Sequence, residues 1–335
     1  MQKSFDEKLQ KILANPNCNE FIIADAKDGD MGFGIPAPGP NFAKDRHRYK
    51  TIEQYRQAMR DLVNEGDVDI MLMSASTSEQ LTIKERLFEG TAVTPAVRAN
   101  DTTDIWCGLS GDYSGQPSLP FRTATIDHIQ TGKYPGNPDE PHIGANLGLY
   151  SITFMNDAEL DRRSLSAYRE FRLEAEQKQF RHFLEVFIPE SFGDRTPNDV
   201  PSFVNDCIAR CLGGVTESAR PLFLKIPYMG AEAMQALCRY DPTVVVGILG
   251  GSSGTTCDAF HLLAEAKSNG ARVSLFGRRI NNADHQLSFV KWLRAVADGK
   301  EAPASAVEKY HADLESFEIK PQRPLEEDIK LTQFD

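Results

Sequence analysis

Lys225 is the residue whose position most strongly suggests chemistry. It lies near the carboxyl end of the apolar segment 221–228, PLFLKIPY. A lysine at the end of a buried strand either extends into solvent or faces a site. To attack a carbonyl carbon the amine must be neutral, and apolar neighbours such as Leu224 and Ile226 favour the neutral form. The segment therefore predicts either a solvated charge or a nucleophilic lysine.

Two glycine-containing segments follow neighbouring strand candidates and are typical of phosphate binding. The first is 247–256, GILGGSSGTT, and the second is 275–281, LFGRRIN. Glycines let a phosphate approach backbone N–H groups, a helix N-terminus carries partial positive charge, and arginine pairs with the anion. The candidate phosphate contacts are Gly250, Gly251, Ser252, Gly277 and Arg278. An ordinary capped turn and a surface arginine pair are the alternatives, but the two segments together favour a phosphate site.

Two carboxylates are candidates for proton transfer. Glu185 interrupts the apolar run Phe183-Leu184-Glu185-Val186-Phe187, and Asp28 follows the first strand candidate. A buried carboxylate needs a partner, and Lys225, one strand over, is the expected partner of Glu185. A structural ion pair for Glu185 and a turn-capping role for Asp28 are the corresponding alternatives.

Several common site motifs are missing from the sequence. The glycine-rich segments match neither a P-loop nor a dinucleotide fingerprint, and there is no GxSxG. The seven histidines form no HxH or HExxH pattern, so we expect no catalytic zinc and no metal site. The six cysteines include no CxxC pair; Cys207 and Cys211, four residues apart, are expected to be thiols stacked on a buried helix face.

Short apolar runs alternate with longer helical patterns, which is typical of an α/β fold. The eight strand candidates begin near residues 21, 69, 92, 145, 182, 221, 244 and 272. The helical patterns span 52–64, 158–178, 202–211, 231–239, 258–269 and 283–298. Several strands are almost entirely hydrophobic, as expected when both faces of a parallel sheet are buried. A further short strand is expected at 123–126.

Eight strands predict a (β/α)₈ TIM barrel, with a doubly wound open sheet as the alternative. Gly/Pro-rich stretches at 27–45 and 100–142 predict loop insertions after strands 1 and 3. We expect a single TIM-barrel domain over 1–335, with an N-terminal helix within 1–18, the barrel over about 20–300 and a C-terminal tail over about 301–335.

The net charge excludes some classes of partner. With 37 Lys plus Arg and 48 Asp plus Glu among 335 residues, the net charge is −11. Such a chain repels nucleic acid at long range, although a local basic pocket can still bind one small phosphorylated ligand. No apolar run approaches the length of a membrane span, and the N-terminus lacks the apolar stretch of a signal peptide. We therefore expect a cytoplasmic protein without membrane or nucleic-acid partners.

From about Gly144 to Asn281 the chain resembles the Schiff-base aldolase group of barrels. That group includes tagatose-bisphosphate aldolase, archaeal-type class I fructose-bisphosphate aldolase and deoxyribose-phosphate aldolase, and the likeness is strongest to the tagatose type. The family pattern IKxxYxG is similar to LKIPYMG at 224–230, and its phosphate-strand GG to GGSS at 250–253. The final GAxGxxxGRNI pattern is similar to GARVSLFGRRI at 270–280. In the first half of the chain, the segment AKD at 26–28 is similar to the alanine-aromatic-aspartate pattern with which a strand of the family ends.

The resemblance implies a class I aldolase, a carbon–carbon lyase of carbohydrate metabolism that needs no cofactor. Lys225 would form the Schiff base, with Asp28 and Glu185 as carboxylates near the substrate. The phosphate of a small sugar or ketone would lie at the glycine and arginine positions named above, and related barrels suggest a homo-oligomer. A lysine and a tyrosine of the tagatose type are replaced here by Leu149 and Pro189. A non-catalytic barrel that binds a phosphorylated metabolite, and a metal-dependent aldolase or epimerase, therefore remain alternatives.

Overall fold

Eight parallel strands close into a barrel in the computed structural model, which describes residues 1–41, 48–106, 110–137, 142–251 and 254–333. Around the barrel the order is β1–β2–β3–β6–β7–β8–β9–β10, and β10 pairs with β1. The strands are β1 (Ile22–Lys27), β2 (Ile70–Met73), β3 (Thr94–Arg98), β6 (Leu147–Thr153), β7 (Arg181–Phe187), β8 (Leu224–Ile226), β9 (Val246–Leu249) and β10 (Val273–Phe276). The predicted TIM barrel and all eight of its strands are confirmed.

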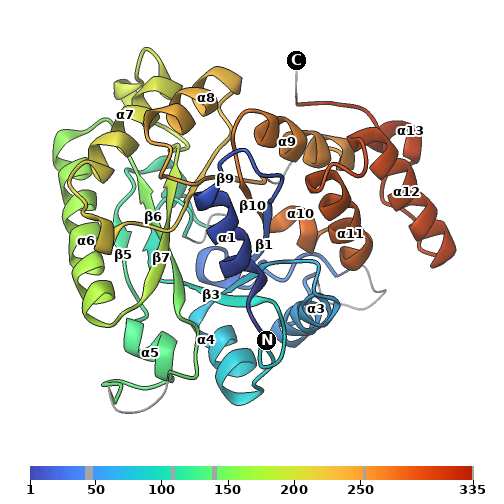
Figure 1. The fold of residues 1–335 in the computed structure, drawn as a ribbon, viewed down its shortest axis with the longest axis horizontal. Coiled ribbons are helices and arrows are strands. Elements are labelled where there is room, and N and C mark those ends of the chain that lie inside the picture. The colour runs from blue at the N-terminus through green and yellow to red at the C-terminus, as the bar shows by residue number, and fades with distance from the viewer. Residues whose placement is uncertain (42–47, 107–109, 138–141, 252–253, 334–335) are drawn as a thin grey trace.

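Helices surround the barrel and connect its strands (Figure 1). The longer ones are α1 (Ser4–Ala14), α3 (Ile52–Glu65), α6 (Ala158–Gln177), α7 (Val200–Leu212), α8 (Ala231–Tyr240), α9 (Thr256–Ser268), α11 (Gln286–Ala297) and α12 (Pro303–Ser316). The shorter ones are α2 (Gly29–Gly32), α4 (Ala75–Ser78), η1 (Glu79–Lys84), η2 (Tyr113–Gly115), α5 (Ile126–Thr131), η3 (Gly193–Arg195), η4 (Glu217–Ala219), α10 (Arg278–Asn281) and α13 (Leu325–Asp328). None of the described helices is both long and apolar enough to cross a membrane.

The barrel interior is apolar at one end and polar at the other. Alternate residues of each strand point inward, and Phe183 and Phe223 belong to the apolar layer that α1 covers with Phe5, Leu9 and Ile12. Two residues further along the same faces, β7 carries Glu185 and β8 carries Lys225. The sequence alternation thus places polar groups at the carboxyl ends of the strands, opposite α1.

The extra strand expected at 123–126 is wrong. The insertion after β3 instead contains a small antiparallel sheet of β4 (Asp101–Thr102) and β5 (Pro120–Phe121). Thr125 is the N-cap of α5, and its side chain accepts a hydrogen bond from His128 N. A threonine-rich stretch favours strands by its β-branched side chains, but the same hydroxyl also caps helices.

The 301–335 segment contributes to the core. Helix α12 buries Ala306, Val307, Tyr310 and Leu314, which join the apolar cluster formed with α9 and α11. The five described cysteines are free, and of the stacked pair Cys211 is buried while Cys207 is partly exposed. Burial raises the pKa of Cys207 to about 12 and that of Cys211 to about 11, consistent with inert thiols.

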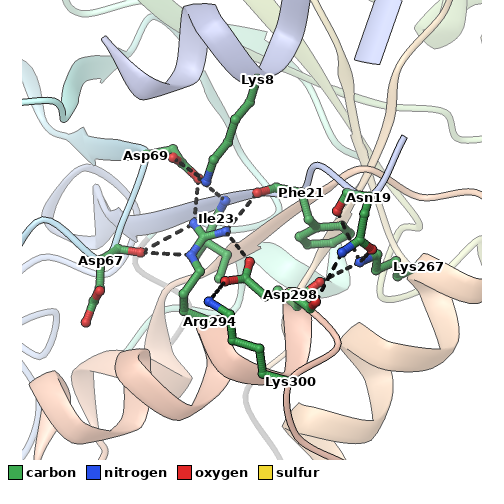
Figure 2. Close-up of polar contacts among 11 residues, drawn as sticks. Lys8, Asn19, Phe21, Ile23, Asp67, Asp69, Lys267, Arg294, Asp298 and Lys300 are labelled. Atoms are coloured by element: carbon green, nitrogen blue, oxygen red, sulfur yellow. Dashed lines mark hydrogen bonds and ion pairs between the residues drawn. The ribbon is translucent and has the colours of Figure 1, made fainter. Parts of the chain in front are cut away.

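A polar network joins the apolar end of the barrel to its surrounding helices (Figure 2). Asp69, just before β2, lies 2.8 Å from Lys8 Nζ of α1 and 2.5 Å from an Arg294 Nη of α11. The same carboxylate accepts a hydrogen bond from Ile23 N of β1 at 2.9 Å. Burial raises the pKa of Asp69, but the charges of Arg294 and Lys8 outweigh it and hold that pKa below its usual value.

We expect Asp69→Asn to lower the free energy of unfolding by about 2–4 kcal/mol at pH 7, because two partly buried cations lose their shared anion. Since the folded-state pKa is depressed, this stabilisation is present above the unfolded value of about 3.9 and is lost as pH falls through the folded value. Urea unfolding at pH 7 and about pH 3 measures both effects. Asp298→Asn, which removes a more exposed carboxylate of the same network, serves as the control and is expected to cost under about 1 kcal/mol.

Candidate active site

A cavity of about 150 Å³ opens at the carboxyl ends of the barrel strands. Its walls contain all the described residues that the sequence analysis proposed for the site: Asp28, Glu185, Lys225, Gly250, Gly251, Gly277 and Arg278. Ser252 lies outside the described residues. The barrel therefore brings the two carboxylates, the lysine and the glycine-rich segments to one place.

Lys225 and Glu185 form an ion pair inside the barrel mouth. They are directly opposite each other in the register of β7 and β8, and Lys225 Nζ lies 2.5 Å from Glu185 Oε1. Only 7% of the lysine side chain and 1% of the glutamate side chain are exposed. Lys225 does not extend into bulk solvent, because its strand position directs it to the cavity wall.

Arg98, at the end of β3, links the two carboxylates. Its Nε donates to Asp28 Oδ2 at 2.6 Å, and an Nη lies 3.5 Å from Glu185 Oε2. Ser151 of β6 accepts from the other Nη at 3.1 Å and donates to Glu185 Oε2 at 2.7 Å. Glu185 is therefore held through one oxygen by Ser151 and Arg98, while its other oxygen is directed to Lys225.

The network alternates in charge, and this sets the ionisation of Asp28. Burial raises the pKa of Asp28, but the nearby charges of Arg98 and Lys225 outweigh it and hold that pKa below its usual value. Burial lowers the pKa of Arg98, but the negative charges of Asp28 and Glu185 outweigh this effect and hold that pKa above its usual value. Asp28 is thus a fixed carboxylate at neutral pH, paired with a permanent cation.

The glycines are required by close packing at this end of the barrel. A Cβ on Gly250 would lie 2.2 Å from the Phe276 ring, and one on Gly277 would lie 2.5 Å from Ala26 O. Gly251 has a φ of +59°, which side chains rarely adopt. The Arg278 guanidinium lies over the Phe33 ring, 5.3 Å from its centre. The glycine backbone and the Arg278 guanidinium thus line the same cavity as the two carboxylates and Lys225, although the Gly250 N–H is already donated to Leu275 O.

The N-terminus of α9 is less available to an anion than the sequence suggested. Thr255 caps the helix, and its hydroxyl accepts a hydrogen bond from Asp258 N at 3.1 Å. Thr256 N, however, donates to the Asp328 carboxylate at 2.8 Å. A phosphate in the cavity would therefore depend on the glycine backbone and Arg278 more than on this helix.

The site also contains residues that were not predicted from the sequence, among them Arg98, Ser151 and Tyr55. Arg98 could have been recognised, because it is a charged residue at the end of the short strand segment TPAVR, as Lys225 is near the end of its strand segment. Ser151 and Tyr55 carry no such signal, since each occupies an ordinary position in a strand or an amphipathic helix. The Tyr55 side chain reaches the cavity from α3, and burial, followed by the charge of Asp30, raises its pKa well above the usual value, so it is a neutral phenol.

Comparison with known proteins gives similarity at the level of structure. No family model matches the chain, and no curated protein matches it in sequence. A crystal structure of an archaeal fructose 1,6-bisphosphate aldolase matches 87% of this chain and 99% of its own, with a TM-score of 0.62 and 15% identity. The fructose-bisphosphate aldolase from Slackia heliotrinireducens matches 92% of this chain and 91% of its own, with a TM-score of 0.62 and 13% identity.

In fold, the chain is similar to TIM-barrel aldolases. A further archaeal fructose-1,6-bisphosphate aldolase, with its catalytic lysine covalently bound to the carbinolamine intermediate of the substrate, matches 87% of this chain and 99% of its own. Its TM-score is 0.59 at 15% identity. These matches agree with the aldolase group named from the sequence and do not distinguish among its members. At such identities the similarity establishes the barrel, and the chemistry depends on the residues of the cavity.

Proposed function

We propose that this protein is a class I, metal-independent lyase that cleaves or forms a carbon–carbon bond in a phosphorylated sugar or related ketone. The observation that carries the proposal is the position of Lys225. Its amine lies on the cavity wall, 2.5 Å from a buried carboxylate, with glycine backbone and Arg278 bordering the same space. Aldolases of similar fold, one of them with a carbinolamine on its catalytic lysine, support the same chemistry.

In this mechanism Lys225 Nζ attacks the ketone carbon of the substrate and forms a carbinolamine. The ion-paired ammonium first gives one proton to Glu185 Oε1, because only the neutral amine can attack. Glu185 passes that proton to the ketone oxygen and then accepts a second proton from the nitrogen. The carbinolamine then loses its oxygen as water and becomes an iminium, which needs a proton delivered to that oxygen. Glu185 returns this second proton to the oxygen, so water carries away both protons that the nitrogen lost and Glu185 is again a carboxylate. Its other oxygen stays hydrogen-bonded to Ser151 throughout.

Carbon–carbon cleavage follows from the iminium. The bonding electron pair moves into the iminium and leaves an enamine, while the hydroxyl of the departing aldehyde loses its proton to a base. Glu185 is the better candidate for that base, since Arg98 holds Asp28 as a stable carboxylate. Asp28 is then suited to orient substrate hydroxyl groups through hydrogen bonds.

A phosphate anchor would orient the ketone over the lysine. Gly250, Gly251 and Gly277 allow an anion to approach the backbone, and Arg278 supplies a local positive charge in an acidic protein. Such anchoring contributes orientation rather than chemistry. The substrate class is accordingly a phosphorylated sugar or ketone.

Reductive trapping tests the proposed nucleophile. After incubation with dihydroxyacetone phosphate and sodium borohydride, the wild-type protein is expected to gain the mass of one reduced adduct, and Lys225→Ala is expected to gain none. Lys291→Ala, which removes an exposed lysine of α11, serves as the control and should retain the adduct.

Peptide mapping locates the modified lysine. Lys27, the fully buried lysine at the end of β1, pairs with Asp25 at 2.7 Å and is not part of the cavity wall, so we expect no adduct there. Absence of an adduct from a panel of phosphorylated ketones and aldehydes would overturn the lyase proposal. Phosphate binding without an adduct would instead favour a non-catalytic binding barrel.

A further inference from the structure

A second cavity, of about 330 Å³, lies beside the candidate active site. It is bordered by α10, α11, α12 and the segment near the C-terminus, which lie side by side at one edge of the molecule (Figure 1). Three arginines line it, Arg278, Arg279 and Arg323, and Arg278 also lines the first cavity. Two carboxylates, Asp284 and Asp328, lie on the same wall. Cations therefore outnumber anions in this cavity, in a chain whose net charge is −11.

The arginines have unused hydrogen-bonding capacity. Among the described residues, none of the three forms an ion pair. Arg279 Nη1 donates to Gly254 O at 2.8 Å, and Arg323 donates to the same oxygen. Arg279 Nη2 is buried and finds no acceptor in the described part of the chain. A buried guanidinium donor without an acceptor is costly, so an external acceptor would stabilise it.

The carboxylates of the wall are already engaged by the protein itself. Asp328 accepts from Thr256 N at 2.8 Å and lies 3.0 Å from His311 Nε2. Asp284 accepts from Gln322 N at 3.3 Å. The two carboxylates remain anions, and the charge of Asp328 acts on Arg279, so the three arginines of the lining exceed its acidic residues by one charge.

We propose that this cavity binds a small oxyanion of the phosphate class, held by Arg279 and Arg323. Guanidinium groups bind such anions through paired N–H donors. The proposal does not depend on the Schiff-base chemistry at Lys225. The phosphoryl group has two possible sources, a second phosphate of the substrate that extends past Arg278, and a separate phosphorylated or inorganic anion.

Titration with inorganic phosphate, together with crystals soaked in tungstate, tests the site. The wild type is expected to bind tungstate between the Arg279 and Arg323 side chains that line the cavity, and Arg279→Met and Arg323→Met are each expected to weaken phosphate binding there by about 10- to 100-fold. Arg239→Met, which removes an exposed arginine of α8 that does not line the cavity, is the matched control and should leave binding unchanged. Arg323 is exposed, so its variant tests the site even if Arg279→Met does not fold.

Unchanged phosphate binding in both variants, or tungstate only beside Gly277, would overturn the proposal. Competition then identifies the source of the anion. Displacement of inorganic phosphate from this cavity by a ketose bisphosphate, but not by dihydroxyacetone phosphate, supports a site for the second phosphate of the substrate. Binding that neither compound displaces supports a separate anion. A failed adduct at Lys225 would leave these results standing, which separates this site from the proposed function.

Discussion

Replacing Glu185 with glutamine is expected to lower the turnover number for carbon–carbon cleavage by about 10²- to 10⁴-fold. Glutamine has the same shape and can keep the hydrogen bond from Ser151 to its side-chain oxygen, but it cannot accept a proton from Lys225. Because the change affects proton transfer more than substrate contact, KM should change by less than about threefold. Steady-state kinetics with a substrate that gives the Lys225 adduct measures both constants.

Rapid-quench trapping with borohydride then separates the steps, since Glu185→Gln should slow the appearance of the adduct without removing it. Ser151→Ala is a graded control: it loosens one oxygen of Glu185 and should lower turnover by no more than about tenfold. If Glu185→Gln kept turnover within about threefold of the wild type, another group would have to transfer the proton, and the assignment of Glu185 would be wrong.

Replacing Arg98 with methionine is expected to lower the free energy of unfolding by about 3–5 kcal/mol at pH 7. Arg98 is 6% exposed in its side chain and is the cation between Asp28 and Glu185. Without it the two buried carboxylates share only Lys225 as a counter-charge. Arg122→Met is the matched control: its pair with Glu174 is about one-quarter exposed on each side, so the loss should be under about 1 kcal/mol.

The pH dependence of this variant has a defined sign. In the wild type the depressed pKa of Asp28 stabilises the fold above the unfolded value of about 3.9, and this stabilisation is lost as pH falls through the folded value. In Arg98→Met that contribution is absent, so the difference in stability between the two proteins should shrink toward low pH. Urea unfolding at pH 7 and at about pH 3 measures it, and a difference that grew on acidification would contradict the proposed role.

Addition of Asp28→Asn to Arg98→Met gives a second test. Removing the carboxylate that Arg98 compensates should recover part of the lost stability, and a double-mutant cycle then gives the coupling between the two side chains. Strict additivity would mean that the 2.6 Å contact does not stabilise the site.

The strands of the barrel could be predicted from the sequence because each is a short apolar run bounded by turn residues. Lys225 and Glu185 were also recognisable, since a charged residue within such a run is unusual. Their contact was predictable only in outline: consecutive strands in a barrel are neighbours, but the register that places Glu185 opposite Lys225 comes from the closed sheet. The small sheet of β4 and β5 was not predictable, because each of its strands is only two residues long and shows no periodic pattern.

The sequence by itself determined the apolar periodicity that builds a parallel barrel, and the residue types that end its strands. The tertiary structure alone decided which of those residues act together. Arg98 and Ser151 reach Glu185 only because strands distant in sequence meet around the barrel, and Asp328 caps α9 from 72 residues away in the chain. The reason is physical: local sequence sets backbone conformation and burial, whereas the pairing of buried charges depends on distances that exist only after the barrel closes.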